Sequence, residues 1–492
     1  MRTLGKGSAL LPNILWIMAD ELRASSIGCY SADPCSPGWD RAVTPHLNSL
    51  AAKGVRFSRH WCNSPACVPS RCSMLTAQSP ERLAIYSNEG AWASYPVPHV
   101  AQTFPEHFAA NGYRTASFGK AHLPRGYSAW QHRDSSGSGM NVFADAVGSA
   151  VLKAIVPRGI PSPVGGRFPD DVYYPPDAVT DNALDWLANT GDQPFMLRVS
   201  YLQPHTPVLP PDRYRARYDP KDFPGHDLPR SEASRYEQLF AAAVGGPELT
   251  HAQMQQAQAD YAALTNWLDD QVGRVLAALD ASELAENTVV VFNADHGASL
   301  GEGGLLAKVV HAPQSQRIPL VIRGPGLPAG AVRDDLSEAM DLARTLCGLA
   351  GIAPDPAFQG RDLFYEPAPE MVFSTIGQGH LGASASSAAN VGTWDGGLGW
   401  PRRACLRTDR WRFDMNVRQD GGPVASENED AFLADSLEDP QEVRNLARDP
   451  AHAGQVAAFR TCLLDRAAAA LEPAFVPQFS AAEVGEFAPP KL

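Results

Sequence analysis

The chain has 492 residues, of which 44% are hydrophobic and 19% charged, and its formal net charge is −13. This length supports a large buried core, and the composition excludes an intrinsically disordered chain. The acidic balance argues against a general nucleic-acid binder but is compatible with a local cationic pocket for an anionic substrate. Eight cysteines are too few for a disulfide scaffold of this size.

The N-terminal region predicts a buried strand and no targeting segment. Its apolar run, residues 14–19, follows Pro12-Asn13 and leads into Asp20-Glu21 without a small-residue cleavage site. No apolar stretch reaches the roughly 18 residues that a membrane-spanning helix needs. We therefore expect a cytoplasmic protein with reduced thiols and no membrane partner.

Strands and helices alternate through the first three quarters of the chain. The expected strands are residues 13–19, 55–60, 113–118, 195–202, 288–294 and 318–323, and the expected helices are residues 44–54, 68–77, 103–112, 178–189 and 254–279. Continuous apolar runs such as TVVVFNA are typical of strands that helices cover on both faces. The alternation predicts an α/β fold with a large mixed, mostly parallel sheet sandwiched by helices.

Two segments predict loops, and a smaller unit follows the second of them. Ser/Gly and Pro/Gly clusters mark residues 130–170 as an insertion with long loops, and residues 379–399 are rich in Gly, Ser and Ala. Hairpin strands and a last helix are then expected at residues 404–415, 431–436 and 452–470. We therefore predict a catalytic domain over residues 1–375 and a C-terminal α+β domain, with a small antiparallel sheet and a tail, over residues 376–492.

Two polar pairs follow apolar strands. Asp20-Glu21 comes after ILWIMA, and Asp295-His296 comes after TVVVFNA. Because ligands of an open α/β sheet bind beyond the carboxyl ends of its strands, we expect both pairs at one edge. Carboxylates with one histidine suit Ca²⁺, Mg²⁺ or Mn²⁺. Taken alone, each of the two pairs is also compatible with the alternative that its aspartate caps the helix that follows.

A third element decides between these interpretations. The segment CVPSR at residues 67–71, followed by Leu-Thr at residues 75–76, resembles the Cys-x-Pro-Ser-Arg-x-x-x-Leu-Thr element of type I sulfatases. The resemblance continues in order from Pro12 to about Leu446, through GKAHL, QPHTP and VVVFNADHGASLGEGGLLAK. The whole chain therefore resembles this branch of the alkaline-phosphatase superfamily. The alternative of a zinc ligand is disfavoured, because the cysteine spacings match no common zinc pattern.

The resemblance implies an alkaline-phosphatase-like fold and a sulfuric ester hydrolase. It implies that a formylglycine-generating maturation system oxidises Cys67. One hydroxyl of the resulting aldehyde hydrate attacks sulfur and displaces the alcohol. Deprotonation of the other hydroxyl then re-forms the aldehyde, and sulfate leaves by cleavage of the C–O bond. One divalent ion, Ca²⁺ first with Mn²⁺ or Mg²⁺ as alternatives, acts as a Lewis acid. Its implied ligands are Asp20, Glu21, Cys67, Asp295 and His296.

The resemblance also implies a set of cationic groups around the sulfate. Arg71, one helical turn into its helix, faces the formylglycine and helps hold its hydrate. Lys120 binds sulfate oxygens, and His122 acts on the geminal hydroxyl; being two positions apart, they point the same way if the segment is extended. His205 and Lys308 bind the ester oxygens, and one of them protonates the leaving alcohol.

The chain departs from the family pattern at a few positions. Glu21 stands where aspartate is usual, so its coordination through a longer side chain is open. His296 replaces the asparagine of many arylsulfatases and resembles the branch that contains phosphonate monoester hydrolases and choline sulfatases. Two alternatives follow: an enzyme that hydrolyses phosphonate monoesters or phosphodiesters, alone or besides sulfates, and a binding protein whose Cys67 is never oxidised.

The expected partners are a small sulfate ester, the maturation system and further copies of the chain. Residues 130–170 and 379–399 are expected at the entrance of the site, with His380, Trp394 and Trp400 as candidates for contact with the leaving group. The C-terminal tail has apolar residues without helical spacing. It predicts contact with a partner subunit, and we expect a homo-oligomer, either a dimer or a tetramer.

Overall fold

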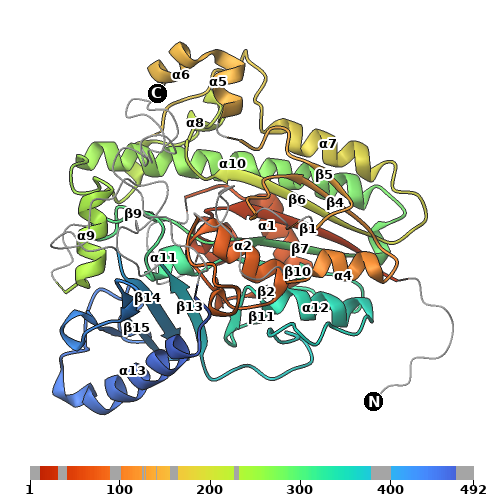
Figure 1. Cartoon of the computed structure of the whole chain (residues 1–492). Helices are drawn as coiled ribbons and strands as arrows, with labels where there is room; N and C mark the ends of the chain where they lie inside the picture. Colours follow the sequence, from red (N-terminus) through yellow and green to blue (C-terminus); the bar gives the residue numbers. More distant parts are fainter. Residues whose placement is uncertain are drawn as a thin grey trace.

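The main body is a sheet of eight strands between layers of helices (Figure 1). The computed structural model describes residues 11–31, 41–88, 101–124, 127, 129–139, 141–155, 165–226, 232–377 and 400–472. In sheet order the strands are β11 (Ala331–Arg333), β2 (Val55–Phe57), β10 (Leu320–Arg323), β7 (Thr288–Ala294), β1 (Asn13–Asp20), β6 (Phe195–Pro204), β4 (Arg114–Gly119) and β5 (His132–Asp134). Strand β10 runs antiparallel to β7 and β2, whereas the other pairs are parallel. The predicted mixed, mostly parallel sheet is confirmed.

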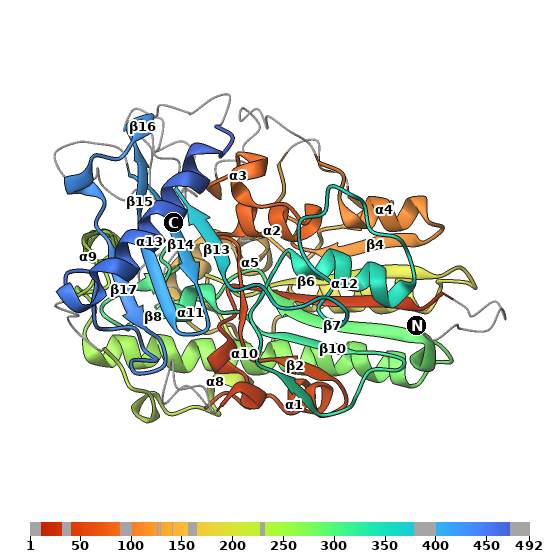
Figure 2. The same cartoon turned by 90° about the horizontal axis from the view of Figure 1, so that it is seen from below.

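Helices cover both faces of this sheet. They include α1 (Pro45–Ala52), α2 (Cys67–Thr76), α4 (Phe104–Ala110), α7 (Asp177–Leu187), α10 (His251–Asp280) and α12 (Asp341–Ala350). Helices α1 and α7 pack beside α10, and α2 contacts α4 and α12 on the opposite face. Figure 2 shows α10 and α1 below the sheet and α2 and α4 above it. Helix α10 begins with a capping box between Thr250 and Gln253, which satisfies two of the N–H groups that a helix start leaves unpaired. No helix in the described part of the chain is long and apolar enough to cross a bilayer.

The two central strands bring the polar pairs of the sequence together. Every residue of β1 and β7 is buried, as expected for strands covered on both faces. The strands are parallel, with Ala19 opposite Ala294. Asp20 and Asp295 therefore lie side by side at the carboxyl edge, as the sequence predicted.

The insertion holds more regular structure than its composition predicted. Residues 130–170 contain β5 and two helices, α5 (Asn141–Val147) and α6 (Ser149–Ile155). Phe143 and Leu152 are buried in the main core, which anchors the two helices. The expectation of long loops missed these helices because each has only one fully buried side chain. The expected loop at residues 379–399 lies outside the described residues.

A second, antiparallel sheet follows in the C-terminal part. It contains β13 (Val372–Ile376), β14 (Arg402–Arg407), β15 (Trp411–Gln419), β16 (Gly422–Pro423) and β17 (Phe432–Asp435), with α13 (Ala453–Ala468) on one face. Leu406, Phe413 and Leu433 pack against Phe459 and Leu463 of α13. The expected hairpin strands and last helix are present. The division at residue 376 stays a prediction, and β13 lies almost wholly on its N-terminal side.

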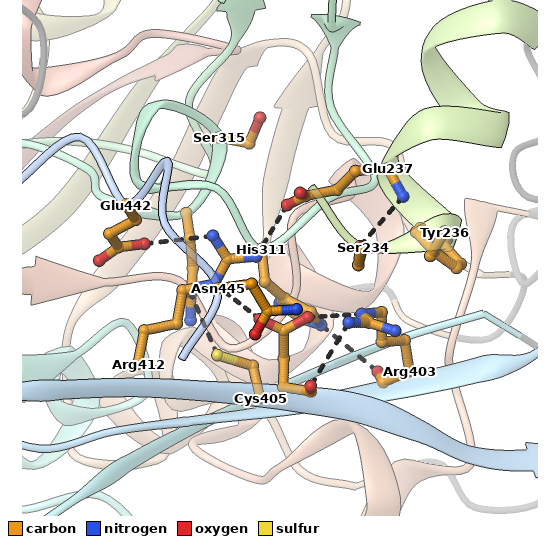
Figure 3. A network of polar contacts seen from close by, with 12 residues as sticks. Ser234, Tyr236, Glu237, His311, Ser315, Arg403, Cys405, Arg412, Glu442 and Asn445 are labelled. Carbon is orange, nitrogen blue, oxygen red and sulfur yellow. Dashed lines mark hydrogen bonds and ion pairs between the residues drawn. The ribbon is translucent and has the colours of Figure 1, made fainter. Parts of the chain in front are cut away.

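The other face of this small sheet is polar and buried against the main body. It carries three arginines whose guanidinium groups pair with three carboxylates, one of them on α9 (Arg235–Ala243) (Figure 3). The six residues are Arg403, Arg407, Arg412, Glu237, Asp414 and Glu442. Arg403 also pairs with Asp430 at 3.2 Å. Because Glu237 lies on α9, these contacts join the sheet to the main body by a buried ionic network as well as by apolar packing.

The Arg412→Met variant tests this network. Arg412 is 1% exposed and pairs with Asp414 at 2.6 Å, Glu237 at 2.8 Å and Glu442 at 3.2 Å. The variant leaves the buried Glu237 carboxylate without its cation and takes one of two arginine partners from both Asp414 and Glu442. We therefore expect urea unfolding to show a loss of about 3–5 kcal/mol in the free energy of unfolding. The control is Arg410→Met, which removes a surface pair with Asp435. Equal losses in the two variants would contradict the importance of the network.

Candidate active site

Four potential metal ligands converge at the carboxyl edge of the main sheet. Asp20 ends β1, Asp295 and His296 follow β7, and Cys67 is the first residue of α2. One ligand atom from each lies within 4.8 Å of the others, and all four side chains are fully buried. Two carboxylates, a ring nitrogen and the Cys67 position form a donor set that fits one divalent ion. Here the Cys67 sulfur stands in for a hydroxyl oxygen of the expected formylglycine hydrate.

Local structure fixes Cys67 at the start of α2. The backbone N–H of Val68 donates to Asn88 Oδ1 at 3.0 Å, and Ser70 Oγ donates to the Asp295 carbonyl at 2.6 Å. The first turn of a helix favours negative charge, because its N–H groups have no partner within the helix. Sequence reasoning missed Asn88, since no motif marks it and only the fold brings it to this helix end.

Arg71 lies between the strand-end carboxylates. Its Nη2 is 2.7 Å from Asp20 Oδ2, its Nε is 2.8 Å from Asp295 Oδ2, and its Nη1 donates to the Lys120 carbonyl at 3.0 Å. Burial lowers the pKa of Arg71, but Asp295 and Asp20 outweigh this effect and raise it above its ordinary value. The guanidinium therefore stays charged and fixes the two acids relative to each other. Within the described residues, its hydrogen bonds go to these groups and Ser200 rather than to Cys67.

Several cationic or ring groups point at the Cys67 sulfur. The Lys308 and Lys120 Nζ atoms lie 3.2 and 3.7 Å away, and His296 Nε2 lies 3.3 Å away. The His122 ring also hydrogen-bonds this sulfur. Burial raises the pKa of the Cys67 thiol, but Lys120, Lys308 and His296 together hold it well below its ordinary value. The position is therefore built to stabilise negative charge.

The ionisable groups of the ion cluster are coupled to one another. Burial and the neighbouring Asp20 carboxylate raise the pKa of Asp295 to about 6. Burial lowers the pKa of His296, but the Asp295 carboxylate outweighs it and raises that pKa to about 9. The packing thus favours a proton on His296, at the place where a bound divalent ion would compete with it. Burial lowers the pKa of His122, so this ring is neutral at neutral pH.

Strained backbone marks several of these residues. Glu21 has φ 61°, His122 has φ 50°, and Ala307 and Val309, which flank Lys308, have φ 59° and 75°. Non-glycine residues in the left-handed region are uncommon and cluster at functional sites. The expectation that Lys120 to His122 is extended is wrong, because His122 adopts a left-handed turn. Both side chains nevertheless reach Cys67.

Glycine 119 ends β4 and makes this approach possible. It has φ +91°, and a Cβ at this position would lie 2.1 Å from the Ser200 carbonyl oxygen. A side chain would therefore push β4 away from β6. The close strand packing lets the Lys120 N–H donate to the same carbonyl at 2.8 Å, which fixes the backbone of Lys120.

Glu21 and His205 border the ion cluster. Glu21 Oε2 lies 2.9 Å from Lys308 Nζ and 3.4 Å from His205 Nε2, and Asp20, Glu21 and His205 form a second group of potential ligands. The backbone N–H of Glu21 donates to Asp295 Oδ1, and its carbonyl accepts from the Tyr261 hydroxyl at 2.6 Å. Tyr261 lies within the helix that the sequence predicts at residues 254–279, and no motif marked this contact with the site.

The expected substrate-binding aromatics are not in the described site. Trp400 is 2% exposed and packs against Tyr236 and Phe240 at ring-centroid distances of 5.2 and 6.3 Å. Its proposed contact with a leaving group is wrong, because the ring is part of an apolar cluster. His380 and Trp394 lie outside the described residues.

Comparisons with known proteins agree on one family. The sequence model described as Sulfatase matches residues 12–352. An uncharacterised sulfatase of Escherichia coli (strain K12) is 26% identical over 92% of this chain and 86% of its own length. Iduronate 2-sulfatase of Mus musculus is 29% identical over 70% of this chain and 69% of its own length. A phosphonate monoester hydrolase from Silicibacter pomeroyi has a similar fold, with TM-score 0.72 at 23% identity, covering 94% of this chain and 96% of that structure.

Proposed function

The chain belongs to the sulfatase family of sulfuric ester hydrolases, and we propose that Cys67, matured to formylglycine, supplies the nucleophile that cleaves a small sulfate monoester. The observation that carries this proposal is the convergence of Lys120, His122 and Lys308 on the Cys67 sulfur beside a buried cluster of metal ligands. Such preorganised positive groups stabilise the charge that develops on a transferred sulfuryl group. The hydrated aldehyde supplies one hydroxyl for attack on sulfur.

We propose that one divalent ion belongs to the site, with Ca²⁺ first and Mn²⁺ or Mg²⁺ as alternatives. Asp20, Asp295, His296 and an oxygen at the position of the Cys67 sulfur would hold it, with Glu21 as a further ligand. When bound, the ion supplies Lewis-acid stabilisation of the sulfate oxygens. The pairing of Glu21 with Lys308 at 2.9 Å gives this carboxylate a second role, because it also orients an ammonium group that faces the substrate.

The remaining groups divide the work of binding and proton transfer. Lys120 and Lys308 bind sulfate oxygens, since both ammonium groups face Cys67. His122, neutral because burial lowers its pKa, accepts the proton of the second hydroxyl of the aldehyde hydrate. His205 or Lys308 protonates the leaving alcohol. Arg71 holds Asp20 and Asp295 in the geometry that the other groups need.

A comparison of two substrates tests the class of ester. We expect the matured enzyme to cleave 4-nitrophenyl sulfate with a higher kcat/KM than 4-nitrophenyl phenylphosphonate. The second candidate function, phosphonate monoester or phosphodiester hydrolysis, rests on His296 and on the structural likeness to the Silicibacter pomeroyi hydrolase. A higher kcat/KM for the phosphonate would favour this alternative, and similar values would indicate a promiscuous enzyme.

We also propose a cytoplasmic homo-oligomer, matured by a formylglycine-generating system. All seven cysteines in the described residues are free, which supports a reducing compartment. The apolar C-terminal tail supports the homo-oligomer, a dimer or tetramer, and light scattering on the purified protein tests it. A protein isolated from its native host with wholly unmodified Cys67 would favour the non-enzymatic binding protein instead.

A further inference from the structure

Lys308 is followed by a short buried segment, residues 309–316, which lies between the active site and the C-terminal sheet. The Val309 N–H donates to the Pro65 carbonyl at 2.9 Å, two residues before Cys67. The Gly297 N–H, next to His296, donates to the Ser315 carbonyl at 2.8 Å. All residues of the segment are buried. The segment therefore contacts both the nucleophile position and the ion cluster, and its placement determines where Lys308 points.

One side chain of the C-terminal sheet contacts this segment at two places. Arg407, on β14, donates from Nη2 to the His311 carbonyl at 2.8 Å and from Nε to Gln316 Oε1 at 2.7 Å. Its guanidinium also pairs with Glu442, Nη2 to Oε2 at 3.0 Å, and lies 4.0 Å from the centre of the Trp61 ring. Arg407 is only 2% exposed, so these contacts fix it in one orientation.

The neighbouring arginines hold Arg407 and its segment from the same sheet face. Glu442 also accepts from Arg412 Nη1 at 3.2 Å, which links Arg407 to the rest of the ionic network. His311, near the middle of the segment, lies with its Nε2 3.4 Å from the Arg403 carbonyl (Figure 3). The segment is thus held by the C-terminal sheet from one side and by the active site from the other.

We propose that Arg407 is a positioning residue for ester cleavage, which acts through residues 309–316 to hold the Lys308 ammonium against the substrate. The proposal rests on the proposed function of Lys308. The left-handed residues on both sides of Lys308 need external support, because strained backbone persists only where the surroundings over-determine it. Arg407 supplies this support from outside the active site, so the C-terminal sheet contributes to catalysis without touching the substrate.

Arg407→Gln tests the proposal, with Arg402→Gln as the matched control. Arg402 is on the same strand and is also buried. Its guanidinium forms a two-pronged pair with Glu472 and lies 3.6 Å from the centre of the Tyr86 ring, and neither partner belongs to residues 309–316. We expect Arg407→Gln to lower kcat/KM for 4-nitrophenyl sulfate by about 10–100-fold. Arg402→Gln is expected to stay within about twofold of the unchanged enzyme. Equal losses in the two variants would overturn the proposal.

A double-mutant cycle separates positioning from a general structural effect. If Arg407 acts through Lys308, adding Arg407→Gln to Lys308→Ala lowers kcat/KM by no more than about twofold. Full additivity of the two losses would overturn the proposal. If turnover of the Lys308→Ala enzyme falls below detection, the same double-mutant cycle can be measured with the Kd for inorganic sulfate, determined by calorimetry.

A second variant covers the case in which Arg407→Gln does not fold. Gln316→Met removes the hydrogen bond from Arg407 Nε and a longer one from Cys405 Sγ at 3.8 Å, and it leaves the ion pair of Arg407 with Glu442 in place. We expect a smaller loss of kcat/KM that also disappears in the Lys308→Ala background. An unchanged kcat/KM in Gln316→Met would contradict the proposal. A loss that is fully additive with that of Lys308→Ala would contradict it as well. Failure of the proposed function itself is distinguishable, because the unchanged, matured enzyme would then cleave no sulfate ester.

Discussion

The Cys67→Ala variant is expected to lose at least about 10⁴-fold in kcat/KM for an aryl sulfate, because it removes the group that we propose as the nucleophile. Binding should survive better than turnover, since Lys120, Lys308 and His205 remain. The variant lacks a side-chain oxygen as well as a sulfur, so no hydrate can form at this position. Steady-state kinetics on enzyme matured in a host with formylglycine-generating activity measures the loss.

Cys72→Ala is the matched control for this variant. Cys72 is also fully buried, lies five residues later on α2, and burial raises the pKa of its thiol. It packs in an apolar cluster with Val68, Leu83 and Ile85. We expect the control to retain its kcat/KM and to lose only some thermal stability. Comparable activity in Cys67→Ala and the control would exclude Cys67 as the nucleophile.

Mass spectrometry checks the chemistry at the same position. The proposed maturation would replace the thiol of Cys67 by an aldehyde, and the mass would fall by about 18 Da, because the lost H₂S is partly offset by one oxygen. We expect this difference in the unchanged protein and in Cys72→Ala, on the peptide that contains residue 67. A mass difference of this size located at Cys72 or at Cys62 would identify that residue, and not Cys67, as the nucleophile.

The Asp295→Asn variant is expected to bind no divalent ion and to lose at least about 10³-fold in kcat/KM. This loss corresponds to several kcal/mol of transition-state stabilisation, which a Lewis acid would supply. Asp295 is central because it also pairs with Arg71 at 2.8 Å and accepts from the backbone of Glu21. Removing its charge therefore weakens both the ion site and the geometry around it. Elemental analysis gives the ion content, and activity gives the second readout.

Chelation and re-addition test the same site without a substitution. Dialysis against a chelator should abolish turnover in the unchanged enzyme, and Ca²⁺, Mn²⁺ or Mg²⁺ added back in turn identifies the ion that restores it. Asp260→Asn serves as the control, because Asp260 is also fully buried and burial raises its pKa to about 6, the same value as Asp295. Full activity of Asp295→Asn after chelation would exclude an ion held at this cluster.

The ends of strands could be read from the sequence because their signals are local. The apolar runs before Asp20 and Asp295 each mark a buried strand, and parallel strands bring their carboxyl ends to one edge. The CVPSR segment is likewise continuous, so Cys67 could be placed at a helix start beside that edge. The insertion at residues 130–170 could not be predicted in this way. Phe143 and Leu152 anchor two helices there, but the sequence has no clear apolar periodicity that would predict them.

By itself, the sequence determined the α/β class, the paired acids at the sheet edge and the family that the motif at Cys67 indicates. Only the tertiary structure showed that Arg71 spans Asp20 and Asp295, that Trp400 is a core residue, and that Arg407 contacts the segment that follows Lys308. The physical reason is distance along the chain. Arg407 and Gln316 are 91 residues apart, and such contacts depend on how two sheets pack, which no local pattern of residues encodes.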